Sequence, residues 1–393
     1  MTAEYVPFIN STTDCTIAKH FYSDAGVVRI SLESIHKTGQ NLPTGAKRWV
    51  DAGIDGLHYL HTKKLEDLSN GYQVHLSKFA KCEQIGSQQF QNKPDKNVVR
   101  QFVFNVLNAC KAHTPDWVSI PQLPLMTDST RNKINRLFAE MTGQWKSETG
   151  YTGKLILPVI FTHQNQLNQK TERNKKITSL LSCFAAAGAD GVWAADSTLT
   201  DQDGSGTFDK RFPALRKFHE EMNAKLPEGV ITICGPYWGM NLVLWTRNCV
   251  RFPAVALGGS YKYNIPGQML QQAKDRLALT PLRRWAVVSP GLKTWLADTV
   301  STLSAGDPAR AEFASIEKDY SKLAANGRTQ IANFYKTWIN KFATLHEAGR
   351  ALALYQDLSA AYVLGKGLGP LPKEEGTARR PERVAQQLMM NCL

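Results

Sequence analysis

Residues 155–196, LILPVIFTHQNQLNQKTERNKKITSLLSCFAAAGADGVWAAD, contain the repeating unit that decides the fold. Two nearly continuous apolar runs, Leu155–Phe161 and Gly191–Ala195, are typical of parallel strands that are buried on both faces. Between them, residues 177–188 carry an apolar stripe that predicts a helix ending at Gly188, where a glycine C-cap is favoured. The stretch is therefore predicted to form one strand–helix–strand unit.

Similar apolar runs recur on both sides of this unit. From residue 117 to residue 285 they begin on average about every 34 residues, close to the roughly 31 residues per unit of a (β/α)8 barrel. The eight predicted strands are Val27–Leu32, Arg48–Val50, Trp117–Ile120, Leu155–Phe161, Gly191–Ala195, Val230–Cys234, Ala254–Leu257 and Trp285–Ser289. They predict an α/β fold, a TIM-like (β/α)8 barrel that forms a catalytic domain over residues 1–300.

The pattern changes after residue 300. Residues 307–360 have helical periodicity without strand signals, which predicts a helical appendage over residues 301–365. The next residues are rich in Gly, Pro and charge, so residues 366–393 are predicted to form a flexible basic tail. The interval 51–114 is long for a single helix and predicts an insertion in the barrel.

Composition limits the classes of partner. Of the 393 residues 42% are hydrophobic, which excludes a wholly disordered chain. A net charge of +13 favours an anionic partner such as nucleic acid, a phosphate compound or a membrane surface. Three basic clusters, Lys170–Lys176, Arg283-Arg284 and Arg379-Arg380, could follow a phosphate backbone, although such clusters are usually solvated surface.

Cysteine and histidine spacing argues against metal sites and disulfides. The seven cysteines are odd in number, scattered, and form no C-x-x-C pair. The nine histidines have no metal-binding spacing, so we expect neither a metal nor a cofactor. No signal peptide and no apolar run of about 18 residues is visible, so a cytoplasmic protein with reduced thiols and no membrane partner is expected.

Two aspartates are the sharpest catalytic candidates. Asp51 and Asp196 each follow an apolar run directly, so both carboxylates are expected at the barrel mouth, where TIM-barrel active sites lie. One would suit acid–base chemistry and the other a nucleophilic or electrostatic role. Alternatively, each caps the helix behind its strand. Because Asn caps about as well as Asp, both Asp→Asn variants are expected to fold normally.

Other residues expected at the mouth suit a flat, phosphorylated ligand. Tyr237, Trp238 and Tyr261 could sandwich a nucleobase, or form an apolar lid against the appendage. His163 could act as an acid–base group or a hydrogen-bond donor, or be an ordinary polar residue.

A glycine-rich loop is expected at the same mouth. Gly258, Gly259 and Ser260 could offer backbone N–H groups to a phosphate, with Lys262 adding a positive charge. Gly-Gly also serves any tight turn after a strand.

Three segments share their order and placement with one enzyme family: RWVDAG at 48–53, WVSIPQ at 117–122, and Gly235-Pro236 ahead of an apolar helix. In these segments the chain resembles the tRNA-guanine transglycosylase superfamily, TIM barrels that exchange a guanine in nucleic acid for a 7-deazaguanine. The resemblance implies that Asp51 matches an essential aspartate. It also implies that Gln122 replaces a base-recognising aspartate.

The chain departs from that family at two places. Leu257-Gly258-Gly259 stands where the family has its nucleophilic aspartate, and the family's zinc-binding Cys-x-Cys-x-x-Cys cluster is absent from the sequence. If the two are related, either Asp196 has taken the nucleophile's role or the chemistry is altered.

The residues and the resemblance together predict a base-exchanging or base-removing enzyme. It would act on guanine in DNA or tRNA, with a purine or 7-deazapurine base as its second substrate. The alternatives are a lyase or hydrolase of a small phosphorylated metabolite, and a nucleic-acid-binding barrel subunit without catalysis.

Overall fold

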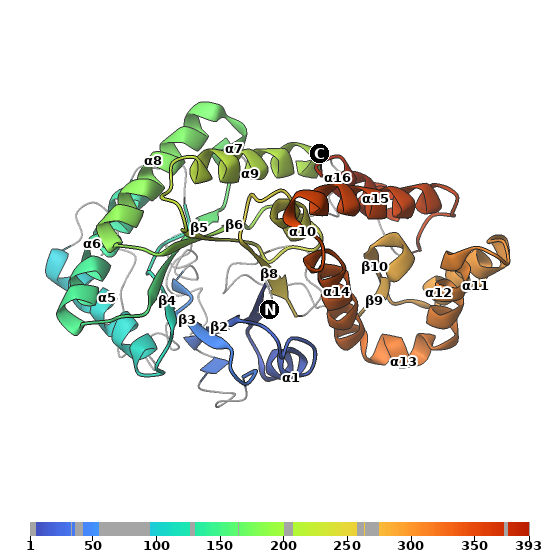
Figure 1. The fold of residues 1–393 in the computed structure, drawn as a ribbon, viewed down its shortest axis with the longest axis horizontal. Helices are drawn as coiled ribbons and strands as arrows, with labels where there is room; N and C mark the ends of the chain where they lie inside the picture. Colours follow the sequence, from blue (N-terminus) through green and yellow to red (C-terminus); the bar gives the residue numbers. More distant parts are fainter. Residues whose placement is uncertain are drawn as a thin grey trace, which may run out of the picture.

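The computed structural model describes residues 5–32, 34–35, 42–54, 95–125, 130–163, 165–199, 207–257, 263, 275–372 and 376–392. Eight parallel strands form a closed barrel in which each pairs with the next and β1 pairs with β8 (Figure 1). The strands are β1 Val6–Ile9, β2 Val27–Ser31, β3 Lys47–Asp51, β4 Trp117–Ser119, β5 Lys154–Phe161, β6 Gly191–Asp196, β7 Ile231–Cys234 and β8 Phe252–Ala256. The predicted eight-stranded (β/α)8 barrel is confirmed.

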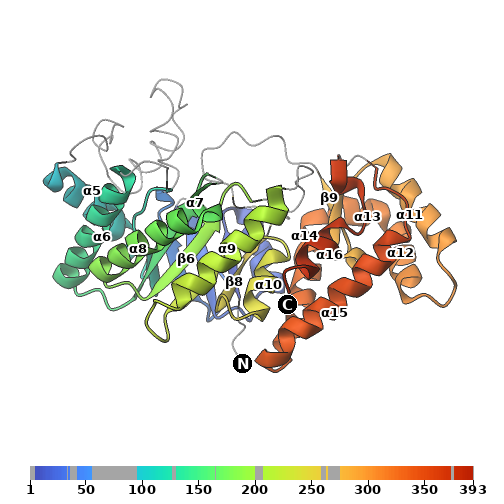
Figure 2. The same ribbon diagram turned by 90° about the horizontal axis from the view of Figure 1, so that it is seen from above.

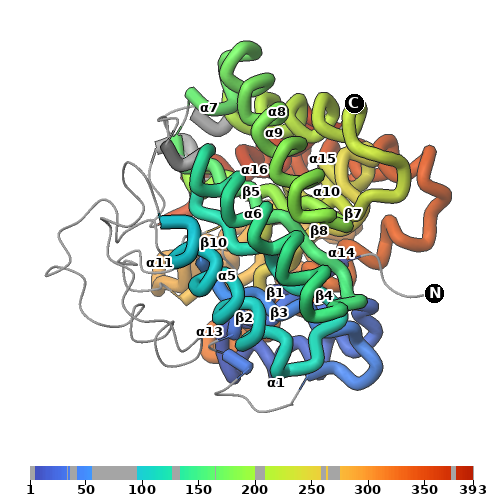
Figure 3. Tube along the Cα trace, turned by 90° about the vertical axis from the view of Figure 1, so that its left-hand side faces the viewer, coloured from blue at the N-terminus to red at the C-terminus, as the bar shows by residue number. Residues whose placement is uncertain are grey.

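Helices cover the outside of the barrel. They are α1 Thr12–Phe21, α5 Lys96–Lys111, α6 Thr130–Thr149, α7 Asn165–Asn168, α8 Lys170–Ala187, α9 Thr207–Asn223 and α10 Met240–Thr246. Figure 3 shows α5, α6 and α8 side by side on one outer face. The predicted C-cap is confirmed, because Gly188 follows α8 with a left-handed φ of 59°.

Aromatic rings fill the barrel interior. Phe8, Trp49 and Trp193 meet edge to face with ring centroids 5.3–5.7 Å apart. The guanidinium of Arg29 lies 4.7 Å from the Phe8 ring centroid and 5.4 Å from that of Trp193. Because side chains alternate along a strand, the residues between these positions face the helices instead.

Two of the predicted strands need correction. The barrel begins at β1, which the sequence analysis missed because Pro7 weakens a four-residue apolar run as a strand signal. The run Trp285–Ser289 does not belong to the barrel. It overlaps β10 Arg284–Val287, which pairs antiparallel with β9 Arg276–Leu279 in a separate hairpin. The barrel strands thus span residues 6–256 rather than 27–289.

The C-terminal region, residues 275–392, packs beside the barrel (Figure 2). It contains the hairpin, η4 Thr280–Leu282, α11 Pro290–Thr302, α12 Pro308–Lys318, α13 Tyr320–Ala325, α14 Gly327–Ala343, α15 Glu347–Lys366, η5 Gly376–Arg379 and α16 Arg383–Met389. The helices expected after residue 300 are therefore present. None of the described helices has the length and apolar character needed to cross a bilayer.

The end of the chain is not the flexible tail that its composition predicted. Within residues 366–393, α16 buries Val384, Ala385 and Leu388, and its Arg383 guanidinium lies 2.9 Å from the Asp209 carboxylate of α9. The Gly- and Pro-rich sequence hid a short amphipathic helix that packs on the barrel.

One buried carboxylate joins three parts of the C-terminal region. Asp357 on α15 accepts two hydrogen bonds from Arg283, at 2.8 and 2.9 Å, and one from Trp338 Nε1 at 2.9 Å. Lys341 also forms an ion pair with it. Burial alone would raise the pKa of Asp357, but its bonds with Arg283 and Lys341 outweigh burial and lower that pKa below its usual value.

We expect Asp357→Ala to lower the free energy of unfolding by about 2–3 kcal/mol at neutral pH, because it leaves Arg283 and Trp338 without their acceptor. Urea unfolding measures this. The stabilisation should be complete above the unfolded-state pKa of about 4 and be lost as the pH falls through the lower folded-state pKa.

The matched control is Asp319→Ala. Asp319 is exposed and makes no side-chain capping bond, so its loss should change little. Equal unfolding midpoints for the two variants at neutral pH would contradict the structural role of Asp357.

Candidate functional site

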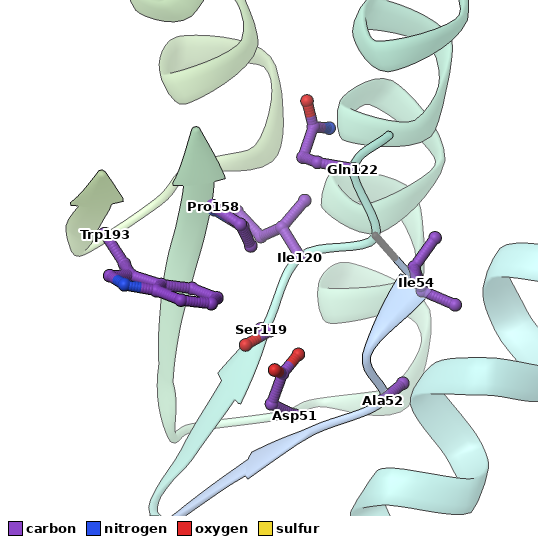
Figure 4. A pocket seen from close by; sticks show the side chains of 8 residues that line it. All are labelled: Asp51, Ala52, Ile54, Ser119, Ile120, Gln122, Pro158 and Trp193. Atoms are coloured by element: carbon purple, nitrogen blue, oxygen red, sulfur yellow. The ribbon is translucent and has the colours of Figure 1, made fainter. Parts of the chain in front are cut away.

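A pocket of about 240 Å³, part of it open to solvent, lies where β3, β4 and the strands β5 and β6 approach the carboxyl end of the barrel (Figure 4). Its lining combines one carboxylate, a hydroxyl, an amide and an indole with apolar side chains. The lining residues are Asp51, Ala52, Ile54, Ser119, Ile120, Gln122, Pro158 and Trp193.

Asp51 is held in this pocket by the barrel itself. It ends β3, and its side chain points inward, like that of Trp49 two residues earlier. One carboxylate oxygen forms an ion pair with Arg29 of β2, and the other accepts a 3.1 Å hydrogen bond from the Gly53 N–H. Arg29 donates in turn to Asn10 Oδ1 at 2.8 Å. The carboxylate is therefore fixed from below while it lines the pocket.

Asp196 lies at the end of a barrel strand but outside the pocket. In β6, Trp193 lines the pocket, so Asp196, three residues later, faces the helices. It is fully buried and ion-paired with Arg211 of α9, and its Oδ1 accepts from Thr198 N and Oγ1 at 2.9 and 2.8 Å. Burial raises the pKa of Asp196, and Arg211 and Thr198 oppose that shift. The capping interpretation describes this residue better.

Of the remaining predicted polar residues, only Gln122 reaches the pocket. Gln122 is buried, and its Nε2 donates to the Asn135 backbone carbonyl at 2.9 Å. His163 is exposed, and its Nδ1 accepts from the Asn165 N–H at 3.3 Å at the start of α7. His163 therefore caps a short helix and does not line the pocket.

The predicted aromatic stacking residues are engaged elsewhere. The Tyr237 hydroxyl donates to the Asp196 backbone carbonyl at 3.0 Å. Trp238 stacks with Phe334, Tyr335 and Trp338 of α14, with ring centroids 5.0–6.2 Å apart. For Trp238 the apolar packing against the appendage is correct, and the nucleobase platform is not formed. The ring that lines the pocket is that of Trp193.

Five predicted residues, Gly258, Gly259, Ser260, Tyr261 and Lys262, lie outside the described residues. The neighbouring Tyr263 is described, and its ring meets the Trp193 indole edge to face with centroids 5.3 Å apart. The glycine-rich phosphate loop thus stays a prediction.

The basic clusters differ in how their charges are used. In Lys170–Lys176, Arg173 pairs with Glu221, Lys175 pairs with Glu172, and Lys176 is buried. These charges therefore do not form an open basic face.

The other two clusters contrast with each other. Arg283 pairs with Asp357, and Arg284 is fully buried. Arg379 and Arg380 are both exposed.

Metal and thiol chemistry finds no site in the described part of the chain. Within it, no three His, Cys, Asp or Glu side chains are grouped to hold a metal ion. Its six cysteines are buried and not disulfide-bonded. Burial raises the pKa of Cys183 and of Cys249 to about 11, which disfavours their thiolate forms.

Sequence reasoning missed three residues of the site. Ser119 accepts a 2.9 Å hydrogen bond from Trp49 Nε1, and Trp193 donates from its indole N–H to the Gly235 carbonyl at 2.7 Å. Arg29 had a visible signal, because an arginine within the apolar run Val27–Leu32 requires a buried counter-charge. Nothing in the sequence alone indicated which face of their strands Ser119 and Trp193 occupy.

In comparisons with known proteins, no family model and no curated protein sequence matches this chain. The chemistry of the site must therefore be argued from its residues. A carboxylate fixed by an arginine, beside an amide and an aromatic wall, can stabilise a developing positive charge on a ring that enters the pocket.

The Asp196–Arg211 pair yields a prediction that corrects the expectation of normal folding. Asp196→Asn keeps the acceptor for Thr198 but leaves the Arg211 guanidinium, itself fully buried, without a counter-charge. We expect this variant to lose about 3 kcal/mol of unfolding free energy. Adding Arg211→Met should restore part of that loss, because it removes the unpaired charge. A denaturation midpoint for Asp196→Asn equal to that of the parent would refute the ion pair's structural role.

Proposed function

We propose that this chain is a base-exchanging or base-removing enzyme that acts on guanine in DNA or tRNA, with Asp51 as its reacting carboxylate. The proposal includes a divergent relationship to the tRNA-guanine transglycosylase superfamily and a cytoplasmic location. The observation that carries it is Asp51, the carboxylate lining the pocket among the described residues, fixed at the barrel mouth by Arg29.

The chemistry asks for a carboxylate near the sugar. As the glycosidic C–N bond breaks, the base leaves with the bonding electron pair and takes up a proton, while positive charge develops at the sugar C1′. Asp51 can stabilise that charge or form a bond to C1′. Water would then give base removal, and an incoming base would give exchange. Arg29 keeps the carboxylate aimed at the pocket throughout.

The neighbouring groups suit recognition of a flat base. Ring edges carry donors and acceptors, and Gln122 offers both through its side-chain amide. Trp193 supplies an aromatic wall on the other side of the pocket, to which a flipped base can pack. Asp196 and His163 have no place in this mechanism, since neither lines the pocket.

The net charge of +13 supports a polyanionic substrate. The rival interpretation as an enzyme of small phosphorylated metabolites depends on Gly258–Ser260, outside the described residues, and no described contact favours it. The non-catalytic barrel is the outcome that a test of activity distinguishes.

The test is release or exchange of a radiolabelled guanine, assayed separately on DNA and on tRNA. Asp51→Asn should lower the rate by about 100-fold or more, equivalent to about 2.7 kcal/mol of transition-state stabilisation. Asp51→Asn also removes the partner of Arg29, so its folding is checked by circular dichroism at the assay temperature.

The matched control is Asp24→Asn. Asp24 precedes β2 at the opposite end of the barrel, where it pairs with Lys336. This variant also loses an ion pair, yet should keep its activity. Equal activity of wild type and Asp51→Asn would refute the proposed mechanism. Nucleic-acid binding without turnover in the wild type would favour the non-catalytic alternative.

A further inference from the structure

Three basic clusters were candidates for phosphate contacts, and their side-chain partners separate them. The cations of two clusters are paired with carboxylates or buried: Arg173 and Lys175 are paired, and Arg284 is fully buried. Arg379 and Arg380 differ. Both are exposed, and neither guanidinium has a carboxylate partner within the described residues.

These two arginines lie beside the barrel mouth. Arg383, the first residue of α16, pairs with Asp209 in the first turn of α9. Two residues further along α9, Arg211 contacts the carboxylate that ends β6, so this turn is at the carboxyl ends of the strands. Figures 1 and 2 both show α16 next to α9. Arg379 and Arg380 precede α16 directly.

The backbone under the two arginines is fixed. The Arg379 carbonyl accepts from the Leu371 N–H at 2.8 Å, and the Arg380 carbonyl accepts from the Arg284 guanidinium at 2.9 Å. The chain therefore presents two adjacent guanidiniums from an anchored segment. Guanidinium groups bind phosphate oxygens through paired N–H donors.

We propose that Arg379 and Arg380 bind the phosphate backbone of the nucleic acid whose base enters the barrel mouth. This inference rests on the proposed function, and it names the surface that holds the strand outside the pocket. The local charge supports a polyanion. Around these arginines, Lys210 and Arg383 add two positive charges, against Asp209 and Glu382 among the described residues.

The experiment measures Kd for fluorescently labelled single-stranded DNA and RNA by anisotropy, between about 50 and 200 mM salt. Each lost phosphate contact should reduce the slope of log Kd against log salt by about 0.7–0.9. The double variant Arg379→Gln/Arg380→Gln should therefore bind more weakly at low salt, with a slope smaller by about 1.4–1.8.

The matched control removes the same charge elsewhere. Lys318 and Lys322 are exposed on α12 and α13, at the end of the C-terminal region away from the barrel (Figure 1). Lys318→Gln/Lys322→Gln should leave the slope within error of that of the wild type.

Several outcomes would overturn the inference. Equal slopes for the arginine variant and the lysine control would refute it, as would binding to anionic vesicles without binding to nucleic acid. Base release is assayed separately: if it depends on Asp51 while the slopes are equal, the proposed function stands and this surface does not.

Discussion

The pairing of β1 with β8 closes the barrel, and the rest of the structure depends on that closure. Once the sheet is closed, inward-facing side chains have only each other as neighbours. Aromatic rings fill most of this space, and Arg29 is enclosed among them. A buried guanidinium requires a counter-charge, because an unpaired charge in such surroundings costs several kcal/mol. Asp51 provides that charge at the one level where the barrel opens into a pocket.

The same physical requirement is met a second time outside the barrel, with a different result. Asp196 and Arg211 also form a buried ion pair at a strand end, but both are sealed between the strands and α9. Their pair holds a helix against the barrel. The pair of Asp51 and Arg29 has a carboxylate that also borders the pocket. Access to the pocket, rather than the identity of the residues, separates a candidate catalytic group from a structural one.

The barrel could be predicted from the sequence because its strands are β-branched apolar runs at regular spacing. Two features escaped prediction for local reasons: Pro7 obscured β1, and the hairpin strand β10 has the same apolar pattern as a barrel strand. Side-chain direction was the larger obstacle. Asp51 and Asp196 each end an apolar run, yet one faces inward and the other outward, which strand pairing decides. Likewise, whether Lys176 is buried depends on distant segments.

The central claim is that a base binds in the barrel mouth between Trp193 and Asp51. The most direct measurement is a crystal structure of the protein soaked with guanine or a 7-deazaguanine. The account predicts the base in this pocket, its edge within hydrogen-bonding distance of Gln122 and one face or edge against the Trp193 indole. A saturating soak that leaves the pocket without the base, or that places the base elsewhere on the protein, would contradict it.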